Sequence, residues 1–356
     1  MAHQRPERNL GDMEIGVANV VAEHETRAPP PIARAPNWLL AWEARRPKWL
    51  MECFAEAMGM FLYVYCGLGA GAAFSTTASA GVSGFGSLFS IGWAYGIGIT
   101  LSIMIAGPTS GSHLNPAYTI AFAIFKGFPW KKVPQYIISQ IFGAFLAALV
   151  VYGAYKQELD LITMELQAAG PIAAAKIFSP EGPAGVFALF TAPGQSLGYV
   201  FLSEIFATAV LSLVVFTILD LSNPFICTYS APVLIGMAYA VVIWAFAPAS
   251  LVLNTARDLG GRFVAGIVWG RGAFPMQYSA LAALTNILGA LLGASIQILF
   301  LADSRRPVSI TVPADEVHRF HRTGSASVVG TPTEEKRGLQ LHAGRSSSDQ
   351  STRVNM

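Results

Sequence analysis

The sequence predicts an all-α membrane protein with six transmembrane helices and two re-entrant half-helices, arranged as an inverted repeat. Three observations support this fold class. The chain has 356 residues, of which 53% are hydrophobic and only 12% are charged. A mean hydropathy of +0.48 is too apolar for a soluble protein of this length. Six apolar segments are long enough to cross a bilayer, and two shorter apolar segments each begin with an asparagine.

Each predicted transmembrane helix is an apolar segment near the roughly 20 residues that a helix needs to cross a membrane. The six segments are 49–71, 89–107, 133–155, 198–219, 228–246 and 280–301. An even number of crossings places both ends of the chain on one side. Basic residues gather at the segment ends on that side, namely Arg45, Arg46, Lys48, Lys126, Lys131, Lys132, Arg305 and Arg306. Because such residues concentrate in cytoplasmic loops, both termini are predicted to be cytoplasmic.

Two further apolar segments, 115–125 and 254–265, are too short to span and are predicted to be half-helices. Their first residues are Asn115, Pro116 and Ala117 in one segment, and Asn254, Thr255 and Ala256 in the other. Asparagine caps the free N–H groups of a helix start, and proline fits the first helical position. Inside a membrane, a helix start is stable only beside water or a polar solute. The two segments therefore predict a shared polar pore.

The two halves of the chain repeat each other. Glu56 lies in the first predicted span and Glu204 in the fourth, 59 and 50 residues before the asparagine of the same half. With three spans per half, the halves run in opposite directions across the membrane, which is typical of inverted-repeat transport proteins. A carboxylate in an apolar span needs partners, and the free N–H groups of the half-helix loops are the ones we expect.

The predicted organisation is a channel domain between two tails. Residues 49–301 form the channel domain, with repeats at 49–155 and 198–301 joined by an extracellular loop at 156–197. The segments 1–48 and 302–356 are polar and are predicted to be disordered cytoplasmic tails.

Composition and residue spacing argue against several other functions. The basic residues lie in short patches, so nucleic acid is not expected as a partner. Cys53, Cys66 and Cys227 have no spacing typical of a metal site or a disulfide framework. His113 has no nucleophile or metal ligand near it in the sequence, so we expect no catalysis. The chain is therefore predicted to be no enzyme and to need no cofactor or metal.

The half-helix starts resemble the paired signature loops of the aquaporin, or major intrinsic protein, family. The segments that carry the resemblance are SGSHLNPA at 110–117 and NTARDLG at 254–260. Tyr118, Asp258 and Arg262 are similar to the glycerol-conducting, aquaglyceroporin-like branch. The resemblance covers about 49–301 and implies a homotetramer in the plasma membrane. Small residues at Gly96 and Gly293 allow close helix packing, which fits contacts within a subunit or between subunits.

The resemblance also implies which residues line the pore. The selectivity-filter positions are Tyr95, Ile243 (or Val242, one position earlier), Leu251 and Arg257. The carbonyls expected to line the pore belong to Gly111, Ser112, His113, Ser250 and Val252. Glu56, Glu204 and Asp258 are expected to brace the loops.

These residues predict a passive channel for glycerol and, with it, water. The fifth span lacks the histidine that water-selective members usually have in the filter, so the filter is apolar apart from Arg257. A permanently charged guanidinium repels cations and donates hydrogen bonds to a solute. Two helix N-termini at the centre also disfavour protons and other cations. The alternatives are a water-selective channel and a poorly conducting pore with a structural or signalling role; a proton-coupled transporter is disfavoured because the two glutamates leave no relay.

The second loop departs from the family pattern. Thr255 stands where a proline is usual, which we expect to cost on the order of 1 kcal/mol of loop stability. Ala282 and Ala283 stand where glycerol-type members often have a proline and an aliphatic residue. The subclass therefore stays open between water and glycerol.

Overall fold

The computed structural model describes residues 35–82, 86–220, 222–227, 229–246, 251–303 and 305–306, and its regular structure in these ranges is helical. Five of the described helices are long and apolar enough to cross a membrane. They are α3 (Lys48–Ser79), α4 (Leu88–Ser110), α6 (Val133–Ala154, preceded by η1, Trp130–Lys132), α9 (Leu197–Ile218) and α12 (Met276–Ile296), which continues as the π-helical turn η6 (Gln297–Leu301).

The remaining predicted span corresponds to α10 (Ala231–Phe246), an apolar helix of 16 residues. This length is below the roughly 20 residues needed to cross the hydrocarbon core. Residues 247–250, which follow it, lie outside the described part of the chain. The other predicted spans differ from the structure mainly at their ends, since α3 extends eight residues past the predicted limit at residue 71 to Ser79.

The two predicted half-helices are α5 (Pro116–Phe125) and α11 (Thr255–Trp269). Asn115 caps α5 by accepting a hydrogen bond from the N–H of Ala117 at 2.9 Å. Asn254 caps α11 by accepting hydrogen bonds from the N–H groups of Ala256 and Arg257 at 3.0 and 3.3 Å. The capping expected from the sequence therefore occurs at both helix starts, and α11 continues four residues beyond its predicted end.

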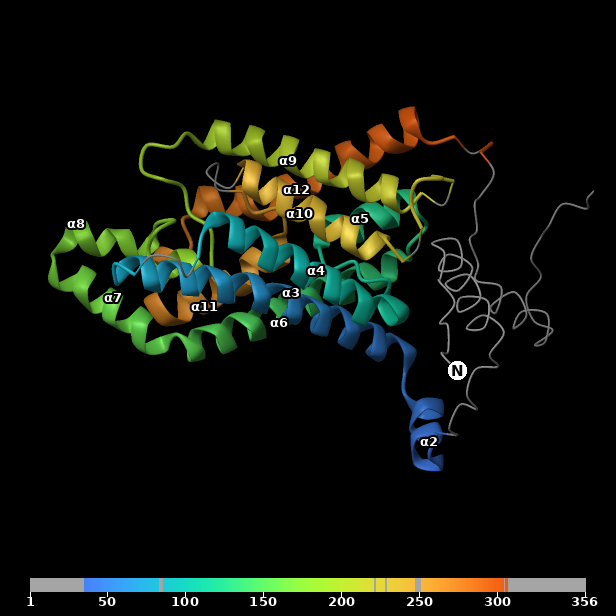
Figure 1. Ribbon diagram of the computed structural model, residues 1–356, viewed down its shortest axis with the longest axis horizontal. Helices are drawn as coiled ribbons and strands as arrows, with labels where there is room; N and C mark the ends of the chain where they lie inside the picture. The colour runs from blue at the N-terminus through green and yellow to red at the C-terminus, as the bar shows by residue number, and fades with distance from the viewer. Residues whose placement is uncertain are drawn as a thin grey trace, which may run out of the picture. The chain divides into compact units, whose positions relative to one another are not determined.

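The helices pack as two related sets, which Figure 1 shows running side by side along the bundle. In the first half α3 packs against α4 and α6, and in the second half α9 packs against α10 and α12. The halves meet where α4 packs against α10. Each half-helix packs mainly against the third long helix of the other half, α5 against α12 and α11 against α6. This exchange brings the two half-helix starts into one interior.

Gly96 and Gly293 allow close helix packing within this chain. The sequence alone left open whether they pack within a subunit or between subunits. A Cβ at Gly96 of α4 would lie 2.7 Å from the carbonyl oxygen of Gly236 in α10. A Cβ at Gly293 of α12 would lie 2.1 Å from the carbonyl oxygen of Ala209 in α9. Any larger side chain would push these helices apart, so both glycines serve helix contacts inside one subunit.

The two ends of the bundle carry different structures. The connection between the halves forms α7 (Lys156–Ala168), α8 (Pro171–Ala174) and the short turns η2 (Ala175–Phe178) and η3 (Pro183–Val186) at one end, at the left of Figure 1. A further turn, η5 (Arg271–Ala273), follows α11.

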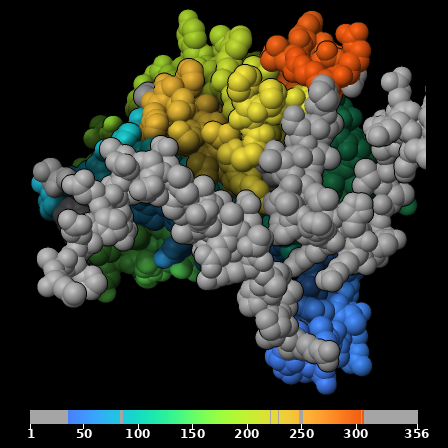
Figure 2. All heavy atoms as spheres, turned by 45° about the vertical axis from the view of Figure 1, so that its right-hand side comes forward, coloured from blue at the N-terminus to red at the C-terminus, as the bar shows by residue number. Residues whose placement is uncertain are grey.

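At the opposite end, α2 (Asn37–Arg45) precedes α3 and has no buried residue. Figure 2 turns this end toward the viewer, with α2 in blue and the end of α12 in orange on opposite sides of it. Helix α2 lies within the segment that the sequence predicts to be a disordered tail. The segments 1–34 and 307–356, which hold the rest of both predicted tails, lie outside the described residues.

Candidate functional site

The starts of the two half-helices are joined directly by their asparagines. The side-chain N–H₂ of Asn115 donates a hydrogen bond to the carbonyl oxygen of Leu253 at 2.9 Å. The side-chain N–H₂ of Asn254 donates one to the carbonyl oxygen of Leu114 at 2.7 Å. Both asparagines are almost fully buried. The structure thus brings together the two tripeptides that the sequence singles out, with one N–H of each side chain used across the junction.

The backbone before each asparagine is strained. Leu114 and Leu253 have positive φ angles of 51° and 58°, and Ser112 has one of 50°. Residues with a Cβ rarely adopt this left-handed region, and such strain persists only when neighbouring groups fix the backbone. The carbonyls of the two leucines accept the asparagine hydrogen bonds, so the loops are alike at the residue just before each asparagine.

Two buried glutamates fix these loops. Glu56 accepts hydrogen bonds from the N–H groups of His113 and Leu114, both at 2.9 Å. It also accepts from the Ser110 hydroxyl at 2.7 Å and the Gln140 amide at 2.8 Å. Because the carboxylate is fully buried, these donors offset its desolvation.

Glu204 holds the second loop in the same way. It accepts hydrogen bonds from the N–H groups of Val252 and Leu253, both at 2.7 Å. The hydroxyl of Thr208 is its third partner, at 3.5 Å. The loop contacts that the sequence proposes for Glu56 and Glu204 are therefore present in both halves.

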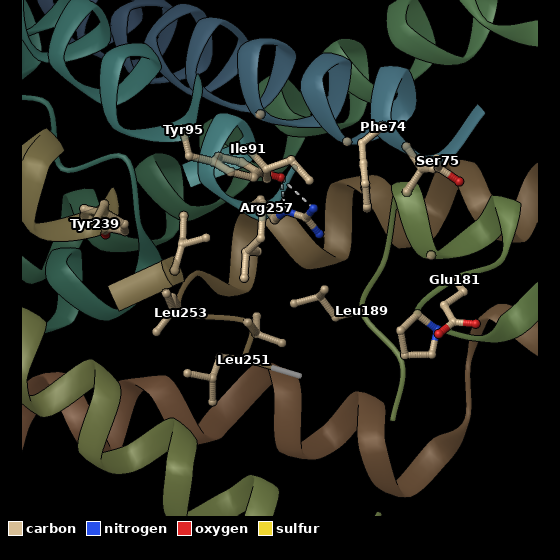
Figure 3. Close-up of a pocket in the computed structure, with 18 of the residues that line it drawn as sticks. Phe74, Ser75, Ile91, Tyr95, Glu181, Leu189, Tyr239, Leu251, Leu253 and Arg257 are labelled. Carbon is tan, nitrogen blue, oxygen red and sulfur yellow. Dashed lines mark hydrogen bonds between the residues drawn. The ribbon is translucent and has the colours of Figure 1, made fainter. Parts of the chain in front are cut away.

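A cavity of about 680 Å³, named here the large chamber, opens toward the end that carries the connection. Figure 3 shows Tyr239 at one end of it, Glu181 at the other and Arg257 between them. Tyr95, Leu251 and Val252 line it, and so do both alternatives for the fifth-helix position, Val242 and Ile243. The residues that the resemblance assigns to the filter thus lie around one cavity.

A second cavity of about 80 Å³, the small chamber, lies on the other side of the asparagine junction. Gly111, Ser112 and His113 line it together with Tyr118 and Asn254. Ser250, the remaining residue expected to present a carbonyl, lies outside the described residues.

His113 lies within an aromatic cluster. Its ring centroid is 4.8, 4.5 and 4.9 Å from those of Phe122, Phe128 and Tyr136. Its Nδ1 lies 3.3 Å from the hydroxyl of Thr119. Within the described ranges, no group of three or more histidine, cysteine or acidic side chains is arranged to hold a metal ion.

Arg257 is held by the protein on three of its N–H groups. Its Nε and Nη2 donate to the hydroxyl oxygen of Tyr95 at 2.9 and 2.6 Å. Its Nη1 donates to the carbonyl oxygen of Phe187 at 3.1 Å. A guanidinium carries five N–H groups, so one on each terminal nitrogen remains for a solute. The sequence predicts neither the Tyr95 hydrogen bonds nor the Phe187 contact.

The position of Tyr95 depends on a glycine in the neighbouring helix. A Cβ at Gly67 of α3 would lie 1.9 Å from the Tyr95 ring. The ring therefore occupies space that any other residue at position 67 would fill. This packing brings the Tyr95 hydroxyl to Arg257.

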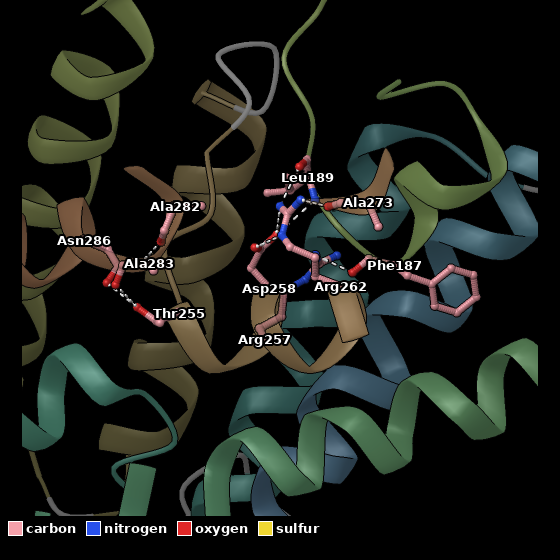
Figure 4. Close-up of polar contacts among 10 residues, drawn as sticks. All are labelled: Phe187, Leu189, Thr255, Arg257, Asp258, Arg262, Ala273, Ala282, Ala283 and Asn286. Carbon is pink, nitrogen blue, oxygen red and sulfur yellow. Dashed lines mark hydrogen bonds and ion pairs between the residues drawn. The ribbon is translucent and has the colours of Figure 1, made fainter. Parts of the chain in front are cut away.

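A buried ion pair anchors the first turns of α11 to the connection, as Figure 4 shows. Arg262 is fully buried and donates to the carboxylate of Asp258 through Nε at 2.7 Å and Nη2 at 2.8 Å. Its other hydrogen bonds reach the carbonyl oxygens of Ala273 and Leu189, both at 2.7 Å. The N–H of Leu189 donates to Asp258 at 3.0 Å. The network satisfies both buried charges, as such a pair requires.

Thr255 has its own polar partners in place of the proline that the family pattern predicts. Its hydroxyl lies 2.9 Å from the carbonyl oxygen of Ala283 and 2.9 Å from the Oδ1 atom of Asn286 (Figure 4). These contacts tie the start of α11 to α12. A threonine in place of proline makes the loop less stable. A buried hydrogen bond, worth about 1 kcal/mol, offsets this loss.

Several residues of the site were missed by the sequence reasoning. Phe187 and Leu189 act through backbone atoms, for which side-chain type gives no signal. Tyr63 and Tyr239 did leave a signal. Tyr63 lies seven residues after Glu56 and Tyr239 three before Val242, spacings that place each on the inward face of its helix.

Asp220, which lies just past the end of α9, has a shifted pKa. Burial alone would raise the pKa of Asp220. The hydrogen bonds from the hydroxyl and N–H of Ser222 and the nearby charge of Lys126 outweigh burial, so the pKa lies below its usual value of 3.8. The carboxylate also accepts a hydrogen bond from Gln297 at 3.2 Å, which ties the end of α9 to η6.

Comparison with known proteins agrees with this geometry. The sequence profile of the family described as major intrinsic protein matches residues 43–300. "Aquaporin-3" of Laccaria bicolor is 44% identical over 80% of this chain and 88% of its own length. A "glycerol uptake facilitator protein" of Pseudomonas aeruginosa is 34% identical over 76% of this chain and 95% of its own.

A solved structure, that of the aquaglyceroporin from Plasmodium falciparum, has the same fold. It matches with a TM-score of 0.60 at 24% identity, over 70% of this chain and 95% of that chain. The predicted fold class, an all-helical membrane protein with several apolar spans, and the predicted family resemblance are thereby confirmed. The chain belongs to the major intrinsic protein family, whose members include the aquaporins, and it is an integral multi-pass membrane channel and not an enzyme.

Proposed function

We propose that the chain is a passive channel for glycerol and water that excludes protons and other ions. The observation that carries this proposal is the lining of the large chamber, where the Arg257 guanidinium and the Tyr95 hydroxyl share one cavity with the aliphatic side chains of Val242, Ile243 and Leu251. A polyol has hydroxyl groups along one edge and carbon along the other, so it suits a lining of both kinds. The resemblance to a glycerol uptake facilitator protein supports this choice.

In the proposed path, a solute loses its water at Arg257 and binds the two N–H groups that Tyr95 and Phe187 leave available. It then reaches Asn115 and Asn254, whose side chains supply donors at the junction. The carbonyls of residues 111–113 and of Val252 supply acceptors on either side. Alternating donors and acceptors replace the hydrogen bonds that the solute made with water.

Ion exclusion follows from the charges along this path. The half-helices α5 and α11 both begin at the junction, so the positive ends of two helix dipoles meet there. Arg257 adds a full positive charge in the large chamber. A cation entering the channel meets both, whereas a neutral solute does not.

One observation favours the second candidate, a water-selective channel. The Tyr95 hydroxyl occupies two of the Arg257 N–H groups that would otherwise face a solute. Fewer available donors favour a molecule as small as water over a polyol. The Tyr95→Phe variant separates the two candidates, because it frees these donors without changing the ring.

The remaining assignments concern placement and assembly. We propose that residues 49–301 form the channel in the plasma membrane, with cytoplasmic tails at 1–48 and 302–356 and an outward-facing connection at 156–197. Large apolar side chains are exposed along the long helices, which suits contact with lipid and with three further copies in a homotetramer. Protease protection in sealed vesicles tests the orientation, and light scattering of the detergent-purified protein tests the tetramer.

The decisive experiment is stopped-flow light scattering on proteoliposomes of the full chain. In a glycerol gradient we expect rapid shrinkage, as water leaves, followed by re-swelling as glycerol enters. Shrinkage without protein-dependent re-swelling would contradict glycerol conduction and support the water-selective candidate. Correctly folded protein with no flux of any small neutral solute would instead support a structural or signalling role.

Two variants test the roles of filter residues. Ile243→His introduces the side chain usual in water-selective relatives and should lower the ratio of glycerol to water permeability.

Arg257→Val removes the charge and should relax the exclusion of cations. Unchanged ion exclusion in the Arg257 variant would remove this residue from the filter.

A further inference from the structure

The large chamber does not end at the filter. It continues past Arg257 to Leu253 and Tyr239, so the cavity remains open on both sides of the guanidinium. The small chamber begins beyond this point and reaches His113. Among the described residues, the two that line both cavities are Tyr63 and Tyr239. The cavity is therefore interrupted at this pair of tyrosines.

We propose that Tyr63 and Tyr239 form a second constriction, which sets the upper size of the polyols that pass. This inference rests on the proposed conduction of glycerol and water. It assigns size selection to the tyrosine pair and leaves ion exclusion to Arg257 and the helix starts. The solutes that this constriction admits are linear, uncharged and about as wide as a glycerol molecule.

The packing of the two rings makes the constriction narrow and stiff. Tyr63 belongs to α3 and Tyr239 to α10, and their ring centroids are 6.3 Å apart at an interplanar angle of 62°. On its other side, Tyr63 packs against Tyr95 at 5.5 Å and 61°. All three side chains are buried. Edge-to-face contacts of this kind are favourable, so a wide solute that pushes Tyr63 aside disturbs two of them.

The hydroxyl groups of the pair reach the signature asparagines. The side-chain N–H₂ of Asn115 lies 3.4 Å from the Tyr239 hydroxyl oxygen, a long hydrogen bond. The Tyr63 side chain interacts with that of Asn254. A solute hydroxyl can replace the long bond between Asn115 and Tyr239 at little cost, because it both donates and accepts. The tyrosine pair therefore offers hydrogen bonds to a polyol at the proposed constriction of the channel.

The test compares the unchanged protein with the double variant Tyr63→Leu and Tyr239→Leu in proteoliposomes. Permeability is measured for polyols of three, four and five carbons and for water. We expect the four-carbon polyol to enter on the order of tenfold faster through the double variant, since about 1.4 kcal/mol of barrier corresponds to a factor of ten. The matched control is Tyr65→Leu, because Tyr65 lies in the same helix, is 42% exposed and lines neither chamber.

A second variant, Tyr63→Phe with Tyr239→Phe, keeps the rings and removes the hydroxyls. We expect the size limit to stay unchanged and glycerol entry to fall severalfold relative to water. This variant also guards against misfolding of the leucine protein, because its rings preserve the packing. The inference is overturned if the double leucine variant, once incorporated into the proteoliposomes, has the same ratio of four-carbon to three-carbon polyol permeability as the unchanged protein.

The experiment still tests the inference if the unchanged protein does not conduct glycerol. Should the unchanged protein conduct water alone, the inference predicts that the leucine variant gains glycerol entry, and continued exclusion of glycerol would overturn it. The arginine gives a further check. If the tyrosines set the size limit, Arg257→Val alone relaxes ion exclusion but still excludes the four-carbon polyol, whereas entry of that polyol would assign the limit to the filter.

Discussion

The two half-helix loops share a left-handed leucine just before the asparagine but are stabilised differently. In the first, Glu56 has four hydrogen-bond donors, and a proline begins α5. In the second, Glu204 has two close backbone donors, and Thr255 begins α11 with a hydroxyl bonded to α12. The second loop also continues into the buried Arg262 network, which bonds to the connection.

This difference follows from what each loop borders. The first loop lines the small chamber through Gly111, Ser112 and His113. The second loop leads into Arg257, whose charge must be held inside the protein beside the large chamber. A buried cation needs fixed acceptors, and the connection supplies them through the carbonyl of Phe187. Symmetric geometry at the junction therefore coexists with additional contacts around Arg257.

The largest difference in stability between the two loops is expected when each glutamate is removed. We expect Glu56→Ala to destabilise the protein more than Glu204→Ala, because it leaves more donors unpaired, at about 1–3 kcal/mol for each buried one. Thermal unfolding of the detergent-purified variants measures the order, with the exposed Glu165→Ala as control. Equal losses in the two variants would mean that Ser110 and Gln140 find other partners.

Removing the arginine tests the contacts that the second half adds. Arg262→Met leaves the buried carboxylate of Asp258 without its counter-ion, and breaking a buried pair in this way costs about 3–5 kcal/mol. The matched control is Arg271→Met in the neighbouring turn, where the residue is exposed. If both variants unfold at the same temperature, the network contributes nothing specific to the second loop.

The substitution Thr255→Val probes the helix start itself. It keeps the shape of the side chain but removes the hydroxyl that bonds to Ala283 and Asn286, so we expect a loss of about 1 kcal/mol in unfolding free energy. Thr255→Ser keeps the hydroxyl and should lose less. Thr255→Pro makes the second loop resemble the first, and greater stability in that variant would show that the proline ring outweighs the hydrogen bonds.

The sequence predicted the features of this fold that depend on local chemistry. Apolar length identified the long helices, and Asn115 and Asn254 identified the half-helix starts because capping needs only the adjacent backbone. The loop N–H groups that bind Glu56 and Glu204 followed from the cost of burying a carboxylate, whereas the Ser110 and Gln140 side chains that also bind Glu56 were not predicted. The contact between Tyr95 and Arg257 could not be predicted in this way, since it depends on the space left by Gly67 in another helix.

The connection between the halves shows the same limit. Its length indicated a loop, and its composition gave no sign that Phe187 and Leu189 would bond to Arg257 and Arg262. Backbone carbonyls are present at every residue, so only the folded path of the chain decides which ones face a guanidinium. The residues proposed for the filter were therefore chosen by resemblance, while the acceptors that hold Arg257 required the structure.

The smallest expected effect concerns the end of the bundle near α2, where each half has one polar tie. In the first half Lys132 pairs with Glu52 at 2.6 Å, and in the second half Gln297 donates to Asp220. Replacing Asp220 by asparagine removes a charge that Ser222 and Lys126 stabilise. We expect a loss below about 1 kcal/mol at neutral pH, as for partly exposed polar ties in general.

The pH dependence of this loss has a definite sign. Because the pKa of Asp220 in the folded protein is below its ordinary value of 3.8, its charge stabilises the folded state above pH 3.8. This stabilisation disappears as the pH falls further, through the pKa of the folded state. Unfolding temperatures of the unchanged protein and the Asp220→Asn variant should therefore differ by a constant amount near neutral pH and converge in acid. A difference that instead grew on acidification would mean that burial, and not Ser222, dominates at Asp220.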